Sequence, residues 1–87
     1  MSTVVQPKAP SVDDVIYVKW DEWEAACNDL GWDNDNKRAV SLEIDHSTIR
    51  RLRRGEIAQP SPEFITRSCC GLNRPFDAFF GFKKRWS

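Results

Sequence analysis

The stretch that decides the fold is Asp35–Gly55, DNKRAVSLEIDHSTIRRLRRG, which has the pattern of two short helices joined by a tight turn. Small or apolar residues recur along it at Ala39, Leu42, Ile44, Ile49 and Leu52. Two helices need this spacing to bury a shared seam at a steep crossing angle. The second helix also carries four arginines, at Arg50, Arg51, Arg53 and Arg54. An apolar inner face opposite an arginine-rich outer face suits a major groove lined by phosphate, so this stretch predicts DNA binding.

The chain before this stretch predicts a short strand and one helix. Trp20, Trp23, Cys27 and Leu30 repeat at helical spacing, so we expect a helix from Trp20 or Asp21 to Leu30. Gly31 suits the end of that helix. Ile16–Val18 is a short β-prone run. Residues 1–14 contain two prolines and several small polar residues, which predicts a disordered arm.

The helix-turn-helix stretch has its own start and stop signals. We expect its first helix from about Asn36 to Leu42. Its second helix follows Asp45, a good N-cap whose carboxylate can accept from the amides of the next turn, and Gly55 stops it.

The chain after this stretch predicts a fourth helix and a second β-prone run. Ser61-Pro62-Glu63 is a strong helix start, and we expect the helix to reach about Cys70 before Gly71 and Asn73 break it. Pro75–Phe80 suits one more helical turn. Phe80–Phe82 is β-prone and can pair with the earlier run.

These signals predict an all-α fold, a compact bundle of four to five short helices that contains a helix-turn-helix. The prediction leaves room for a short two-stranded ribbon that joins the two ends. At 87 residues the chain is long enough for one domain with a small core. We expect the arm at residues 1–14, the helix-turn-helix domain at residues 15–82 and a basic C-terminal tail at residues 83–87.

Charge is divided between the two parts of the chain although the net charge is zero. Residues 1–36 hold eight acidic and two basic side chains, whereas residues 37–87 hold eleven basic and five acidic ones. A dipolar molecule of this kind can present its positive end to phosphate. The charge distribution therefore agrees with double-stranded DNA as a partner.

Several other classes of protein find no support in the sequence. Cys27, Cys69 and Cys70 have neither disulfide-framework nor zinc-site spacing, and the single histidine, His46, has no thiol at ligand spacing. No phosphate-binding glycine loop or hydrolase motif occurs, and adjacent Asp45-His46-Ser47 cannot form a catalytic triad. We therefore expect no enzyme, cofactor, metal or small-molecule ligand. Reduced thiols and the absence of a signal-peptide or membrane-span pattern predict a cytoplasmic protein.

The run AVSLEIDHSTIRRLRRG, residues 39–55, resembles the helix-turn-helix of the lambda-repressor and Cro-like family, also called the XRE family. Three other segments fit the layout of that family: Leu30-Gly31-Trp32, Pro62–Ile65 and Arg74–Phe80. Over residues 16–82 the chain is similar to small actinobacterial and actinophage regulators. The resemblance implies a repressor or Cro-like transcriptional regulator of a phage or bacterial operon, acting in the bacterial cytoplasm.

The sequence departs from the family pattern at two positions. Glu43 stands where the family usually has glycine, and a left-handed conformation costs a non-glycine residue roughly 1 kcal/mol, so we expect a remodelled turn. Arg38 stands where the family usually has an apolar residue. We expect its stem to lie along the core while its guanidinium reaches solvent or phosphate.

Helical geometry assigns roles to the candidate DNA contacts. At roughly 100° per residue, Ile49 and Leu52 point inward, which turns Ser47 and Arg54 most directly outward. We expect base or near-base contacts from His46, Ser47, Arg50 and Arg54, and a phosphate contact from Arg53; Arg51 can make either kind of contact, and we favour phosphate. The full set of DNA-binding candidates is His46, Ser47, Arg50, Arg51, Arg53, Arg54, Arg38 and Lys37.

Other interpretations remain open at this point. The arginine run can be a solvated helix face, and His46 can be a surface residue with no role. The same fold can serve as a protein-interaction module, such as an antirepressor or antitoxin, or as an excisionase-like architectural DNA binder. If the chain is a homodimer, Phe80–Phe82 and the tail with Trp86 are the expected contacts, while Trp20, Trp23 and Trp32 are expected in the core.

Overall fold

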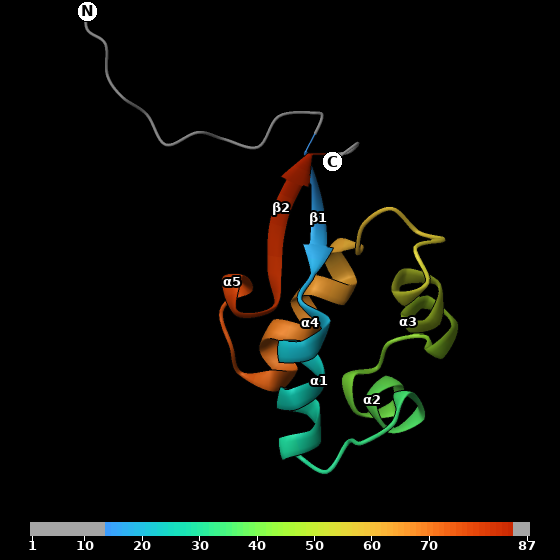
Figure 1. Ribbon diagram of the computed structural model, residues 1–87. Helices are drawn as coiled ribbons and strands as arrows, with labels where there is room; N and C mark the ends of the chain where they lie inside the picture. The colour runs from blue at the N-terminus through green and yellow to red at the C-terminus, as the bar shows by residue number, and fades with distance from the viewer. Residues whose placement is uncertain (1–13, 85–87) are drawn as a thin grey trace, which may run out of the picture.

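The structure is a group of short helices with a two-stranded ribbon at one end (Figure 1). The computed structural model describes residues 14–84. In chain order the elements are β1 (Asp14–Val18), α1 (Trp20–Asp29), α2 (Asp35–Leu42), α3 (His46–Arg53), α4 (Pro62–Leu72), α5 (Phe76–Phe79) and β2 (Phe80–Lys84). The expected arm, apart from Asp14, and the end of the tail with Trp86 lie outside the described residues.

The ribbon makes the fold mixed α/β, so the all-α prediction is wrong. β1 pairs antiparallel with β2, from Asp14 opposite Lys84 to Val18 opposite Phe80. Val15 and Val18 are both buried, at 4% and 8% exposure, although residues three apart in a strand point to opposite faces, so β1 is covered on both sides. The strands run beyond the β-prone cores, so the expected domain limits at residues 14/15 and 82/83 fall inside them.

Three of the described helices, α2, α3 and α4, begin at a side-chain cap. α2 begins at Asp35, one residue before the expected start, and Asn34 caps it by accepting from the Lys37 amide at 2.8 Å. Asp45 caps α3 by accepting from the Ser47 amide at 3.0 Å. This hydrogen bond, together with a second one from the Ser47 hydroxyl, holds the pKa of Asp45 below its ordinary value. Ser61 caps α4 through the Phe64 amide at 3.2 Å.

Gly71 lies inside α4 and does not break it, contrary to expectation. A Cβ at this position would come within 2.4 Å of Cδ2 of Leu42, which is buried on α2. The glycine therefore allows α2 and α4 to approach closely. The helix ends at Asn73, whose left-handed backbone (φ 55°) forms the C-cap.

The core is an aromatic cluster under the ribbon. Trp23 is fully buried, stacks on Phe64 with ring centroids 5.7 Å apart, and donates its indole N–H to Ser68 Oγ at 3.0 Å. Phe80 also packs on Phe64, with ring centroids 6.2 Å apart. Because Phe80 is 1% exposed, it is a core residue and cannot serve as the expected dimer contact; Phe82, which is 49% exposed, stays on the surface.

Candidate nucleic-acid interface

The turn between α2 and α3 keeps the left-handed geometry, so the expected remodelling is wrong. Glu43 has φ 57° and ψ 44°, and the Ile44 amide behind it donates to the Ala39 carbonyl at 2.9 Å. Arg67 of α4 reaches the turn, with its Nη1 3.2 Å from Glu43 Oε1. A glutamate thus occupies a position that favours glycine, and α4 contacts its side chain.

The predicted seam between α2 and α3 is present. Ala39 and Leu42 are buried on α2, at 6% and 4% exposure. Ile49 and Leu52 are the buried residues of α3, at 0% and 8% exposure. These four belong to the same apolar core cluster, with Ile44 of the turn partly buried against it. The opposite face of α3 is left for solvent or a ligand.

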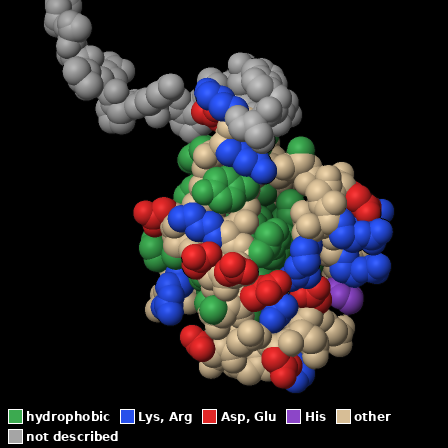
Figure 2. Space-filling view, viewed as in Figure 1, with side chains coloured by type: hydrophobic (Ala, Val, Ile, Leu, Met, Phe, Trp, Pro, Cys, Tyr) green, Lys and Arg blue, Asp and Glu red, His purple; other side chains and the backbone are tan. Residues whose placement is uncertain are grey.

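The outward face of α3 carries the basic side chains. Figure 2 shows a dense group of Lys and Arg side chains on the α3 side of the molecule, beside the single histidine. The exposed candidates on this helix and its cap are His46, Ser47, Arg50, Arg51 and Arg54. The structure therefore places five of the eight predicted DNA contacts on one accessible surface.

These five side chains differ in the hydrogen bonds and ion pairs that they form within the protein. Among the described residues, Arg50 and Arg51 make no side-chain hydrogen bond or ion pair. Arg54 Nε lies 3.3 Å from Glu56 Oε2, but both side chains are about half exposed or more, so the pair is weak. The Ser47 hydroxyl donates to Asp45 at 3.0 Å and keeps its acceptor capacity.

Lys37 lies in the first turn of α2, where a helix-turn-helix approaches the DNA backbone. Its Nζ is 2.9 Å from Asp33 Oδ1, and the two side chains are 52% and 67% exposed. The hydrogen bond and charge of Lys37 hold the pKa of Asp33 below its ordinary value. An exposed pair of this kind contributes little free energy, so the ammonium can exchange this carboxylate for a phosphate.

Arg38 does not reach solvent or phosphate, which corrects its prediction as a DNA contact. Its side chain is 8% exposed, and its guanidinium donates to three oxygens. Nε bonds the Trp32 carbonyl at 3.0 Å, Nη1 bonds Asp35 at 3.0 Å, and Nη2 bonds Asn28 at 2.8 Å. A buried guanidinium needs such partners, so the whole side chain, and not only its stem, is structural.

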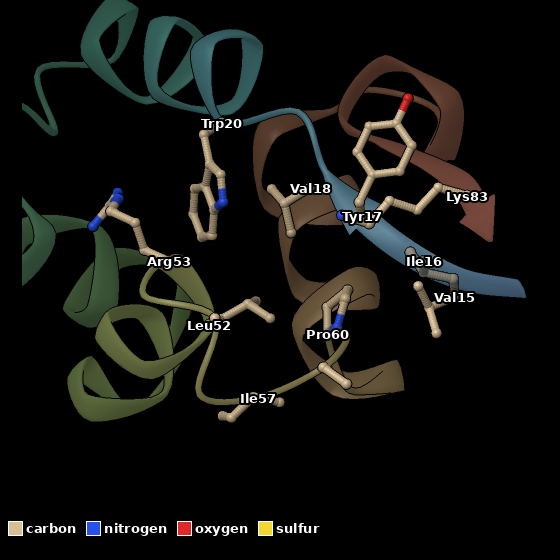
Figure 3. Close-up of a pocket in the computed structure, with 12 residues that line it drawn as sticks. Val15, Ile16, Tyr17, Val18, Trp20, Leu52, Arg53, Ile57, Pro60 and Lys83 are labelled. Atoms are coloured by element: carbon tan, nitrogen blue, oxygen red, sulfur yellow. The ribbon is translucent and has the colours of Figure 1, made fainter. Parts of the chain in front are cut away.

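Arg53, which was expected to contact phosphate, has internal partners in the structure and is 30% exposed. Its Nη2 lies 2.7 Å from Glu24 Oε2 on α1, and its Nη1 donates to Asp35 Oδ2 on α2. Its guanidinium carbon lies 4.6 Å from the centroid of the Trp20 ring, and Figure 3 shows the two side chains side by side. The guanidinium is thus shared between two carboxylates and an aromatic face.

Asp35 joins the two internal arginines, and no role was predicted for it from the sequence. Partial burial opposes its ionisation, but side-chain hydrogen bonds from Arg53 and Arg38 outweigh burial and hold its pKa below the ordinary value. The i,i+3 spacing of Asp35 and Arg38 was a usable signal for one of these contacts. Nothing in the sequence joins Glu24 to Arg53, since they are 29 positions apart.

A second feature lies behind α3, on the side away from its exposed face. A hollow of about 420 Å³ separates β1 from the loop after α3 (Figure 3). Its apolar lining includes Val18, Trp20, Leu52 and Ile57. The Ile16 amide at its edge donates to the Gln59 side chain at 2.9 Å, so the loop partly covers the open edge of the ribbon.

Within residues 14–84, no group of metal-ligating side chains is large enough to hold a metal ion. None of the described helices has the length and apolar character needed to cross a membrane. Comparison with known proteins finds no matching family model, no matching curated protein and no matching solved structure.

Proposed function

We propose that the chain is a sequence-specific regulator that binds double-stranded DNA by placing the exposed face of α3 in a major groove. In this proposal Arg50, Arg54, Ser47 and His46 approach base edges. Arginine is the best reader of guanine, because its two N–H groups match the O6 and N7 acceptors. The protein would act as a repressor or Cro-like regulator of transcription, the role implied by its resemblance to that family.

The observation that carries the proposal is the contrast between arginines on one helix. Arg53 is neutralised by Glu24 and Asp35, whereas Arg50 and Arg51 form no ion pair among the described residues, and Arg51 has only a weaker coulombic attraction to Asp45. Arg50 and Arg51 add positive charge to the exposed face of α3, and Arg50 and Arg54 are like charges at the unfavourable i,i+4 spacing. The phosphates of a polyanion would neutralise this positive charge, whereas a helix face that only contacts solvent does not need it.

The phosphate contacts expected from this surface are Arg51 and, from α2, Lys37. Each phosphate neutralised releases condensed counterions, so log affinity should fall with log salt by about 0.9 per phosphate contact. Asp21 and Glu22, the exposed acids in the first turn of α1, lie on a different helix from the basic group, although Glu24 of α1 pairs with Arg53 of α3. This separation lets a chain of zero net charge present a positive surface.

Selection from a random duplex library, followed by fluorescence anisotropy on the selected sequence, tests the proposal. We expect a selected consensus, a steep salt dependence, and much weaker binding to unselected DNA. No binding to any duplex at low salt would contradict DNA binding and favour a protein-interaction module. Binding with equal affinity to all sequences, together with bending of the duplex, would favour the architectural binder.

A further inference from the structure

Arg53 lies where three helices meet. It projects from the last turn of α3, pairs with Glu24 on α1 at 2.7 Å, and donates to Asp35 on α2. Its guanidinium also covers the ring of Trp20, the first residue of α1. One side chain of the helix that carries the basic surface therefore contacts both of the other helices around it.

The acids that Arg53 joins are part of a longer chain of charges. Asp35 also accepts from Arg38 at 3.0 Å, and Arg38 in turn donates to Asn28 near the end of α1 at 2.8 Å. The alternating series Glu24, Arg53, Asp35 and Arg38 therefore runs from α1 through α3 to α2 and back to α1. Its side chains are between 8% and 36% exposed, so water screens these contacts less than it screens the surface pairs.

The geometry points to Arg53 as a positioning residue that fixes the orientation of α3 against α1 and α2 and does not contact phosphate. This inference rests on the proposed function and deepens it. α3 has eight residues, of which only Ile49 and Leu52 are buried. A seam of two side chains does not by itself fix the rotation of α3 relative to α1 and α2. Arg53 fixes the side of α3 next to this seam through its contacts with Glu24 and Asp35. Side chains that read bases must be held within about 0.5 Å of their working positions.

Removal of Glu24 distinguishes positioning from simple electrostatics. Glu24→Gln removes a negative charge, which by Coulomb's law alone should strengthen binding to a polyanion. If Glu24 instead holds Arg53 and thereby α3, the same substitution should weaken binding. Glu22→Gln is the matched control, because Glu22 is an exposed acid on the same helix with no ion pair among the described residues.

Anisotropy titrations on the selected duplex and on a random duplex, each over a range of salt, make the comparison. We expect Arg53→Met and Glu24→Gln to weaken binding to the selected duplex by about tenfold, the loss of roughly one base contact. Their salt slopes should stay at the wild-type value, while Arg51→Met should lower the slope by about one unit. Glu22→Gln should leave affinity unchanged or raise it slightly. Tighter binding by Glu24→Gln, or a salt slope lowered by Arg53→Met, would overturn the inference.

Residual dipolar couplings of the free protein read the orientation of α3 without DNA. We expect α3 to reorient relative to α1 in Arg53→Met and Glu24→Gln, and to stay in place in Glu22→Gln. An unchanged orientation would overturn the inference, whether or not the wild type binds DNA. If Arg53→Met fails to fold, Arg53→Lys replaces it, since lysine keeps the charge but cannot bridge two carboxylates in a planar fork. A wild-type protein that binds no duplex would instead refute the proposed function, while these couplings still decide the orientation.

Discussion

Replacing Glu43 by glycine and, separately, by alanine measures the strain held in the turn of the helix-turn-helix. The left-handed backbone at φ 57° costs a non-glycine residue about 1–2 kcal/mol. Glycine removes that cost but loses about 0.5–1 kcal/mol more backbone entropy on folding than alanine does. Both variants lose the contact with Arg67, which cancels between them. Glu43→Gly should therefore be more stable than Glu43→Ala by about 0.5–1 kcal/mol.

Urea unfolding followed by tryptophan fluorescence gives this difference, because Trp23 is fully buried and becomes exposed on unfolding. In thermal unfolding the same difference corresponds to roughly 2–8 °C in Tm for a domain of this size. Thr66, exposed inside α4, provides the control: there Thr66→Gly should be less stable than Thr66→Ala by about 1 kcal/mol. If alanine were as stable as glycine at position 43, the left-handed turn would be refuted.

Four further outcomes follow from the packing and the charges. Ile49→Ala should lower the free energy of unfolding by about 2–5 kcal/mol, because Ile49 is fully buried in the seam; an unchanged denaturation midpoint would contradict that packing. Gly71→Ala should destabilise despite the higher helix propensity of alanine, since its Cβ meets the buried side chain of Leu42, and calorimetry should show a lower Tm. The contribution of Asp35 to stability should be complete above its ordinary pKa of 3.8 and lost as pH falls through the lowered value; Asp35→Asn should flatten that part of the acid unfolding curve. Arg50→Ala should cost about 1–3 kcal/mol on the selected duplex and less on random DNA, and equal losses on both would show that Arg50 only contacts the backbone.

Short-range signals account for what the sequence predicted correctly about the fold. Asp45 and Ser61 cap helices because their side chains bond amides two or three residues away, and that chemistry is visible in a few letters. The buried positions of α2 and α3 follow from the 3.6-residue period. The exposure of Arg50 and Arg51 follows from the same period, since the opposite face is apolar.

Long-range contacts account for what the sequence could not show. Arg53 was assigned to phosphate because its acidic partners lie 18 and 29 positions away in the sequence. Helical periodicity indicates contacts within one helix and does not reveal partners on other helices. Gly71 was taken as a helix breaker because its role depends on Leu42, which another helix brings to it. The all-α class was wrong for a related reason. The sequence allowed the two β-prone runs to pair, but their pairing is a contact between opposite ends of the domain, and local sequence patterns do not establish it.

The ribbon has a consequence for the order in which the polypeptide becomes a folded domain during synthesis. Phe79, at the end of α5, and Phe80, at the start of β2, are among the largest fully buried side chains of the described residues. They follow all of α1 to α4 in the chain. A ribosome makes the chain from the N-terminus, so the helices emerge before the side chains that fill the space beneath them. The complete core of the domain therefore forms late on the nascent chain. A polypeptide that stopped before residue 79 would carry every arginine of α3 and the seam between α2 and α3, but would lack the two phenylalanines that complete the core.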